Sequence, residues 1–280
     1  MTTTTVPAST TTPAKRASGP LLPPVLASEW TKLRSVRSTI WSLFATLGIT
    51  IGFGALLCFA YVSRYDQLSI RERLTFDPTA QSLRGLFLAQ LAIGVLGVLV
   101  ISSEYASGAI RTTLAAVPQR RVILAGKAIA FGAVALVVSM VAVFTAFIVG
   151  QAVLTSKHVG VSLGDPGVLR AVLGAGAFLA IVGLLGLGIG TIVRRTAGAI
   201  ATLLGLVLVL PLLAQALPSP WNNDVSKFLP SGIGAGLGSA MLSVRPDPAS
   251  LSPGVALLVL MGWVTATFGI GAFLISRRDA

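Results

Sequence analysis

Residues 128–151 read AIAFGAVALVVSMVAVFTAFIVGQ, an apolar run of 24 positions without a charged residue or a histidine. A helix that crosses the roughly 30 Å hydrocarbon core of a bilayer needs about 20 such residues, because lipid offers no hydrogen-bond partners and the backbone must satisfy itself. Five further runs have the same character: 39–62, 86–103, 171–193, 196–217 and 254–276. The sequence therefore predicts an all-α integral membrane protein with six transmembrane helices.

The composition agrees with a membrane protein. Hydrophobic residues make up 54% of the 280 positions and charged residues only 11%, too few to coat the surface of a large soluble helical protein. The six runs leave no connection long enough for a separate soluble domain. We expect residues 24–280 to form a single transmembrane domain, and the Thr- and Pro-rich residues 1–23 to form a disordered tail.

The formal net charge of +12 is distributed unevenly along the chain. If the N-terminus is cytoplasmic, the segments on the inner side hold 13 Lys and Arg residues and the outer segments hold 8. Positively charged loops stay on the cytoplasmic side of a membrane, so both termini are expected in the cytoplasm of a multi-pass plasma-membrane protein. Topology and anionic lipids account for the basic excess, and no nucleic-acid partner is needed.

The segment 24–39, just before the first run, has helical periodicity. Its apolar residues fall on one face: Leu26, Trp30, Leu33, Val36 and Ile40. Its charged residues lie away from that face: Glu29, Lys32, Arg34 and Arg37. The pattern predicts an amphipathic helix in the inner headgroup region, with Trp30, Lys32, Leu33, Arg34 and Arg37 as its interfacial residues. The alternative is a basic flank that only orients the first span.

The connection 104–127 reads EYASGAIRTTLAAVPQRRVILAGK. Gly108 can end the preceding helix and Pro118 stops a following one, which leaves a short helix over 109–117. Its apolar stripe consists of Ile110, Leu114 and Val117, with Arg111 beside it. A helix of this length is marginal alone in water, so it must dock, either on its own membrane surface or on a separate cytoplasmic partner.

Two strings carry a resemblance. SEWTKLRSVRST at 28–39 and EYASGAIRTTLAAVPQRR at 104–121 resemble the permeases of ATP-binding cassette (ABC) exporters of the ABC type 2 membrane family, especially those of actinobacteria. The resemblance implies an interfacial helix in the first string and, in the second, a coupling helix that contacts a separate ATPase subunit. The implied contact residues are Glu104, Gly108, Ile110, Arg111, Leu114, Val117, Pro118, Arg120 and Arg121.

The same resemblance implies a long outer loop with short re-entrant helices between the last two spans. Residues 218–253 have the required length, and 228–242 are apolar enough to dip into the membrane. The glycine content of that stretch makes a regular helix there doubtful.

Nucleotide-binding and catalytic motifs are absent. In the sequence Gly126-Lys127, position 121 holds Arg where the first Gly of G-x-x-x-x-G-K-[ST] should stand. We therefore expect no cofactor in this chain, with ATP and Mg bound by the partner ATPase. The only histidine, His158, has no nearby partners for a metal site, and Asp165, Asp224 and Asp247 are expected to be loop residues. The chain is not expected to be an enzyme.

The leading function is the passive, substrate-conducting permease of an ATP-driven exporter. The alternatives are a secondary transporter and a membrane anchor or enzyme subunit. All six runs lack ionisable groups and contain a single proline, Pro211, whereas ion-coupled carriers usually keep such groups or broken helices near the midplane. The Gly48/Gly52 and Gly186/Gly190 pairs are expected to be packing faces, and could form the seam with a second permease chain. The cargo is not identified by the sequence.

Overall fold

The computed structural model describes residues 22–110, 119–219, 221–241 and 250–278. Within these ranges the chain is helical and contains no strand. Six segments are long and apolar enough to cross a membrane, which confirms the predicted all-α integral membrane protein. They are α2 (Arg37–Arg64), α5 (Leu86–Ser107), α7 (Arg120–Leu154), α8 (Val168–Val193), the segment from α9 (Thr196–Leu204) to α10 (Leu210–Gln215), and α14 (Pro253–Arg278).

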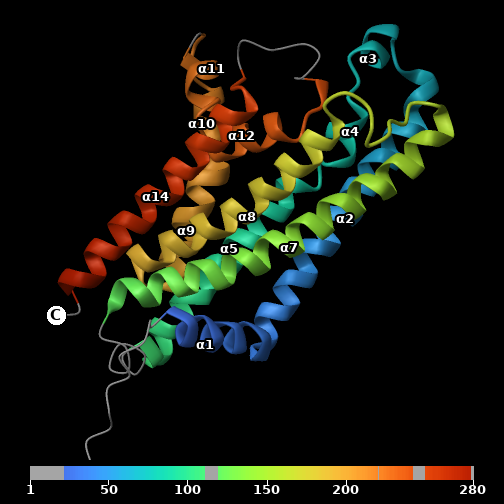
Figure 1. Cartoon of the computed structure of the whole chain (residues 1–280). Helices are drawn as coiled ribbons and strands as arrows, with labels where there is room; N and C mark the ends of the chain where they lie inside the picture. The colour runs from blue at the N-terminus through green and yellow to red at the C-terminus, as the bar shows by residue number, and fades with distance from the viewer. Residues whose placement is uncertain (1–21, 111–118, 220, 242–249, 279–280) are drawn as a thin grey trace, which may run out of the picture.

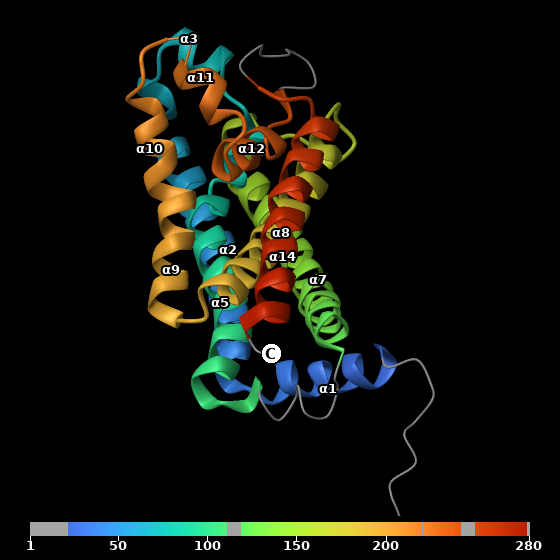
Figure 2. The ribbon, with the colours of Figure 1, turned by 90° about the vertical axis from the view of Figure 1, so that its left-hand side faces the viewer.

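Helix α8 lies at the centre of the bundle, with α5, α7 and α14 packed around it (Figure 1). Helix α2 packs on α7 and α5, and α9 packs on α8 and α5. The first helix, α1 (Leu22–Ser35), runs across one end of the bundle, the end where the described chain also terminates (Figure 2). We call this the basal end. The opposite, distal end carries the short helices α3 (Ile70–Leu74), α4 (Pro78–Ser82), α11 (Trp221–Ser226) and α12 (Pro230–Leu237).

The contact between α5 and α8 depends on glycine. A Cβ atom on Gly186 would lie 2.1 Å from the carbonyl oxygen of Gly94, and one on Gly97 would lie 2.0 Å from that of Gly183. Small residues at such crossings let helix backbones touch in a membrane, where van der Waals packing replaces the hydrophobic effect. Gly186 therefore serves internal packing and not a seam with another chain.

The other glycine pair lies on an open surface. Cβ atoms on Gly48 and Gly52 of α2 would meet no described atom within 4 Å. The same helix exposes large apolar side chains, including Phe44 and Phe59. This face of α2 is therefore available to lipid or to a second chain.

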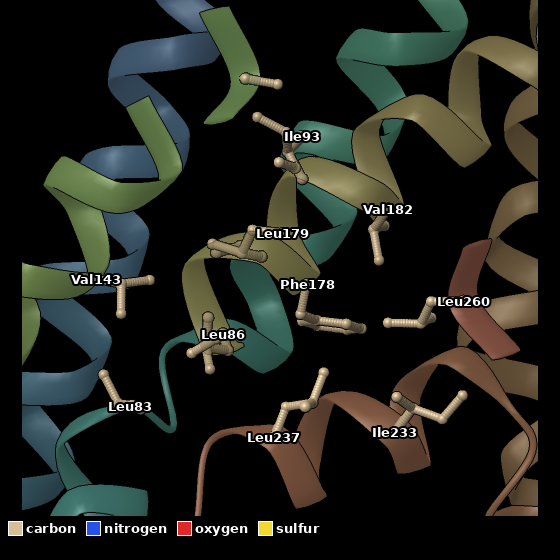
Figure 3. Close-up of a cluster of buried hydrophobic side chains, with 14 of the residues drawn as sticks. Leu83, Leu86, Ile93, Val143, Phe178, Leu179, Val182, Ile233, Leu237 and Leu260 are labelled. Atoms are coloured by element: carbon tan, nitrogen blue, oxygen red, sulfur yellow. The ribbon is translucent and has the colours of Figure 1, made fainter. Parts of the chain in front are cut away.

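The distal end closes over an apolar core that α12 completes. Ile233 and Leu237 of α12 point toward Phe178 of α8, next to Leu86 at the start of α5 (Figure 3). The expectation that glycine would prevent a regular helix here is wrong. A Cβ atom on Gly234 would lie 2.4 Å from the Phe178 ring, so glycine permits the ring to pack against the α12 backbone.

Five spans extend beyond their uncharged runs, and in α5 and α7 the extension brings a buried charge into the helix. Helix α5 continues to Ser107 and not only to 103, and α7 begins at Arg120 and not at 128. Both extensions include a charged residue, Glu104 and Lys127 respectively, whose charge is neutralised inside the protein. The fifth span differs in another way: a π-helical turn over Gly205–Val209 interrupts it just before Pro211, which has no N–H to continue the α-helical ladder.

The glycine packing yields a prediction. Gly186→Leu forces a side chain into the α5 backbone and should lower the free energy of unfolding by more than about 2 kcal/mol, in the range of severe overpacking. Gly52→Leu is the matched control and should leave stability unchanged. Thermal unfolding in a mild detergent measures both, and a stable Gly186→Leu protein would contradict the close α5–α8 contact.

Candidate functional site

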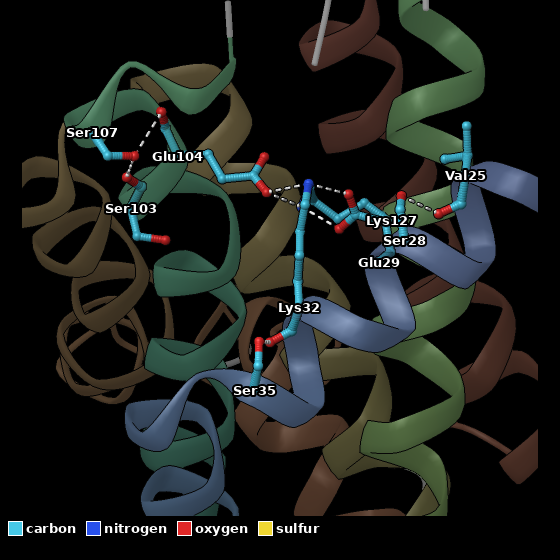
Figure 4. Close-up of polar contacts among 9 residues, drawn as sticks. All are labelled: Val25, Ser28, Glu29, Lys32, Ser35, Ser103, Glu104, Ser107 and Lys127. Carbon is cyan, nitrogen blue, oxygen red and sulfur yellow. Dashed lines mark hydrogen bonds and ion pairs between the residues drawn. The ribbon is translucent and has the colours of Figure 1, made fainter. Parts of the chain in front are cut away.

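Four charged side chains from three helices meet at the basal end: Glu29 and Lys32 of α1, Glu104 of α5, and Lys127 of α7 (Figure 4). We call them the basal charge cluster. Lys127 Nζ donates to Glu29 Oε2 and, at 2.9 Å, to Glu104 Oε1. Lys32 Nζ donates to Glu29 Oε1 at 2.7 Å and to Glu104 Oε1 at 2.9 Å. Each carboxylate thus contacts both ammonium groups, and the formal charges balance.

The cluster is buried on one side and reaches solvent on the other. The side chains of Lys127 and Glu29 are each 2% exposed, that of Glu104 is 11% exposed, and that of Lys32 is 40% exposed. A lone buried charge is very costly, so such groups persist in proteins only when they are paired. Burial alone would lower the pKa of Lys32, but its hydrogen bonds to Glu29 and Glu104 outweigh that effect and raise this pKa. Lys32 therefore remains charged at neutral pH.

The cluster sets the rotation of α1 against the bundle. Val25, Glu29 and Leu33 are one turn apart and form the buried face of α1. A Cβ atom on Gly126 would lie 2.5 Å from Val25 Cγ1, so the glycine before Lys127 allows α1 to approach α7. Gly126, which permits the close approach of the Val25 side chain, and Lys127, which pairs with Glu29, are thus neighbouring residues of α7.

The predicted apolar face of α1 is only partly correct. Leu33 of that face is buried against the bundle, whereas Trp30 is 52% exposed, as suits a headgroup position, and Val36 and Ile40 lie beyond the end of α1 and are also exposed. Glu29, which the pattern places away from the apolar face, points into the bundle. The reason is that pairing with Lys127 outweighs the apolar stripe.

Of the other three residues predicted in the interfacial helix, Lys32 and Arg34 belong to α1, and Arg37 is the first residue of α2. Arg34 and Arg37 are exposed, whereas Lys32 joins the charge cluster. Val36 adopts an extended backbone that separates α1 from α2. The helical segment therefore ends at Ser35, before the predicted boundary at 39.

The segment predicted to contact an ATPase emerges beside the charge cluster. Gly108 takes a left-handed conformation, with φ of 73°, and ends α5 as predicted. Ile110 is half-buried and lies with Tyr105 and Ile275 around a small cavity. Arg121 is exposed at the start of α7. The remaining predicted contact residues, Arg111, Leu114, Val117 and Pro118, lie outside the described residues.

Two arginines bind the C-terminal end of α14 at the basal end of the bundle. Arg120 Nη1 of α7 donates to the carbonyl oxygen of Ile275 at 2.8 Å, and Arg194 Nη2, just after α8, donates to that of Leu274 at 3.3 Å. Both carbonyls belong to the last turns of α14, where cationic donors interact favourably with unpaired carbonyl groups and with the helix dipole. Arg120, predicted as a contact residue, is therefore also part of the internal structure.

Sequence reasoning missed the role of Glu29 and Lys127. The sequence predicts only that Glu29 lies on the charged side of the amphipathic helix and that Lys127 ends the connection 104–127. One signal was available: Gly126-Lys127 lies within a stretch that is otherwise helical and apolar from 122 onward. A lone lysine in such a stretch requires a buried carboxylate, and Glu29 and Glu104 are the only acidic residues of the inner segments besides Asp279.

A second polar cluster lies at the distal end. Asp77 Oδ1 caps α4 by accepting from the backbone N–H groups of Thr79 and Ala80. Its Oδ2 accepts from Ser239 Oγ at 2.7 Å and from the backbone N–H of Met241 at 3.1 Å. Asp77 therefore fastens the connection between α2 and α5 to the segment after α12.

The polar loop residues singled out in the sequence make local contacts. Asp165 accepts from the backbone N–H of Ser162, Asp224 pairs with Lys227 at 2.7 Å, and His158 ends a short turn with φ of 56°. Asp247 lies outside the described residues. In the described part of the chain, no three His, Cys, Asp or Glu residues lie close enough to hold a metal ion.

Comparison with known families gives a match over most of the chain. The model of the family described as ABC-2 family transporter protein matches residues 53–280. The matched segment includes Glu104 and Lys127, but it begins after α1 and so excludes Glu29 and Lys32. No curated protein matches the chain.

The charge cluster yields a prediction based on a double-mutant cycle. Lys127→Met leaves two carboxylates buried beside Lys32 alone, and Glu29→Gln removes one carboxylate from Lys127. Each should cost about 3–5 kcal/mol of unfolding free energy, because breaking a buried pair leaves an uncompensated charge. The double variant should cost clearly less than the sum of the two.

The exposed pair Lys157–Asp66 is the matched control, since its members are 33% and 80% exposed. Lys157→Met should change stability little. Unfolding in mild detergent measures every variant. Strict additivity of Glu29→Gln and Lys127→Met would show that the two groups do not interact.

Proposed function

The chain belongs to the ABC-2 family of transporter proteins, and from that membership we propose that it is the permease of an exporter driven by a separate ATPase subunit. Members of this family are multi-pass membrane components of ABC-type transporters and are not themselves catalytic. In this proposal ATP and Mg bind to the ATPase, and the present chain supplies the substrate pathway. A second permease chain, identical or related, completes the pathway.

The observation that carries the proposal is where the two helices joined by the connection 108–119 lie. The connection joins the basal ends of α5 and α7, both of which pack on the central helix α8. A partner that pushes on this segment acts on the two helices at once. Glu104 lies in the last turn of α5, Lys127 lies about two turns into α7, and the two side chains bind each other. A force on the connection therefore acts on α5 and α7 together.

The proposed ATPase contact consists of residues of this connection together with the first two residues of α7. Its residues are Gly108, Ile110, Arg111, Leu114, Val117, Pro118, Arg120 and Arg121. The resemblance implies Glu104 as a contact residue, and its side chain is 11% exposed and bound to two lysines. We assign it the role of holding the base of the contact segment in place.

In this proposal the exporter lies in the plasma membrane and its basal end faces the cytoplasm. The excess of Lys and Arg in the segments at this end supports that orientation. The exposed Trp30, Arg34 and Arg37 suit the headgroup region of the inner leaflet, where aromatic and basic side chains concentrate.

One observation favours the alternative of a secondary carrier. Glu104 and Lys127 are ionisable residues within spanning helices, where such groups often mark ion pathways. They lie at the basal end and not at the midplane, and their charges are balanced by Glu29 and Lys32. Together with the family membership, this position favours a structural role and the ATP-driven exporter.

The test replaces an apolar residue of the contact segment. Leu114→Asp should prevent co-purification of the ATPase, because a charge in an apolar contact costs several kcal/mol, on the order of the whole interaction. The matched control is Leu74→Asp at the distal end, where Leu74 is 69% exposed. Recovery of the ATPase with Leu114→Asp at the level seen with Leu74→Asp would contradict the proposed contact.

A further inference from the structure

A pocket of about 310 Å³ opens at the distal end between the start of α5, the central helix α8 and the short helix α12. We propose that this pocket binds an anionic amphiphile: a molecule with an apolar body, a hydrogen-bond donor near its head, and an acidic head group. The proposal deepens the proposed function, on which it rests, by assigning a ligand class to a specific place in the permease. The volume of the pocket lies at the lower end of the range for small-molecule sites, about 300–1,000 Å³.

The pocket has a largely apolar interior. Leu83, Leu86 and Phe87 line it from the start of α5 and the turn before it, and Phe178 lines it from α8. Figure 3 shows Leu83, Leu86 and Phe178 on the side that faces Leu237 of α12. Such walls favour an alkyl or aryl body over a small ion or a sugar, which would leave its polar groups unpaired.

One buried polar side chain in the pocket lacks a partner for its acceptor. Gln90 is 2% exposed, and its Nε2 donates to the carbonyl oxygen of Phe87 at 3.0 Å. Its Oε1 has no hydrogen-bond partner within the described ranges. Buried amide oxygens are nearly always paired, so Gln90 Oε1 calls for a donor, which a hydroxyl or N–H group of a ligand supplies. Ser231 Oγ of α12, also at the pocket, is likewise buried without a described partner.

The charge at the pocket is positive. Arg84 is among the residues that line the pocket, and it is exposed to solvent. No carboxylate of the described residues forms an ion pair with it. Its planar guanidinium matches the oxygens of a phosphate or carboxylate. The head group therefore lies at Arg84, its donor reaches toward Gln90, and the body extends toward Phe178.

Two sources can supply a molecule of this chemistry: the surrounding bilayer, as an anionic lipid, and the transported cargo. The level of the pocket at the distal ends of the spans suits both, because lipid head groups and a cargo leaving an outward-facing pathway reach the same depth.

The test measures binding of two matched probes to the purified full-length chain by native mass spectrometry, below the concentrations at which the probes form micelles. Lauroyl lysophosphatidylglycerol has an anionic head, and lauroyl lysophosphatidylcholine has the same chain and glycerol hydroxyl with no net charge. The wild-type chain should bind the anionic probe at least about tenfold more tightly.

Variants separate the parts of the site. Arg84→Glu should abolish the preference for the anionic probe, whereas Arg71→Glu, an equal charge change at the exposed helix α3, should retain it. Gln90→Leu should weaken both probes equally by removing the acceptor. Ala235→Trp, at an exposed position of the pocket wall, should block both by filling the pocket. Equal binding of the two probes to the wild-type chain, or unaltered binding to Arg84→Glu or Ala235→Trp, would overturn the proposal.

The source of the ligand is decided with the chain reconstituted together with its ATPase in vesicles. Release or movement of the anionic probe upon ATP addition identifies cargo, and retention through ATP hydrolysis identifies a bound lipid; both support the site. The proposed function fails separately: if no ATPase associates while the probe preference and its loss in Arg84→Glu persist, the pocket stands and the exporter does not. If the ATPase associates but the probe preference is absent, the exporter proposal stands and the proposed ligand site is wrong.

Discussion

The ammonium group of Lys127 is held between the carboxylates of Glu29 and Glu104, with its side chain 2% exposed, and the basal end of the molecule is organised around it. An uncompensated charge at this position would cost several kcal/mol, comparable with the net stability of a whole domain. Helix α1 must therefore turn Glu29 inward, and α5 must continue as far as Glu104. The helix before the first span is in this way fixed to the two helices that flank the proposed ATPase contact.

Helix α5 links the basal end to the centre of the bundle, because it packs against α8. Glycines at Gly94, Gly97 and Gly186 bring the two backbones into direct contact. At the distal end the same two helices form walls of the pocket at Gln90 and Phe178. The fifth span differs, because its π turn interrupts the regular ladder of hydrogen bonds. The molecule thus combines a rigid central pair with a less regular span at its periphery.

Much of this arrangement could be predicted from the sequence, because length and the absence of charge determine which segments span a membrane. Gly108 as a helix end also followed from local chemistry. The rotation of α1 did not, since its apolar stripe is outweighed by the pairing of Glu29 with a residue 98 positions away. The same criterion of uncharged runs ends the α5 span too early, before Glu104, and begins the α7 span too late, after Lys127. The regular helix α12 and the pocket beside it depend on the fit of Gly234 against Phe178, which spacing in one sequence does not reveal.

The central claim is that this permease works in an assembly driven by another polypeptide through its basal end. The most direct measurement is the mass of the purified transport-active complex in nanodiscs. The account predicts two permease chains with two ATPase chains, and transport that stops when ATP is removed. A single permease chain that transports without ATP would contradict it.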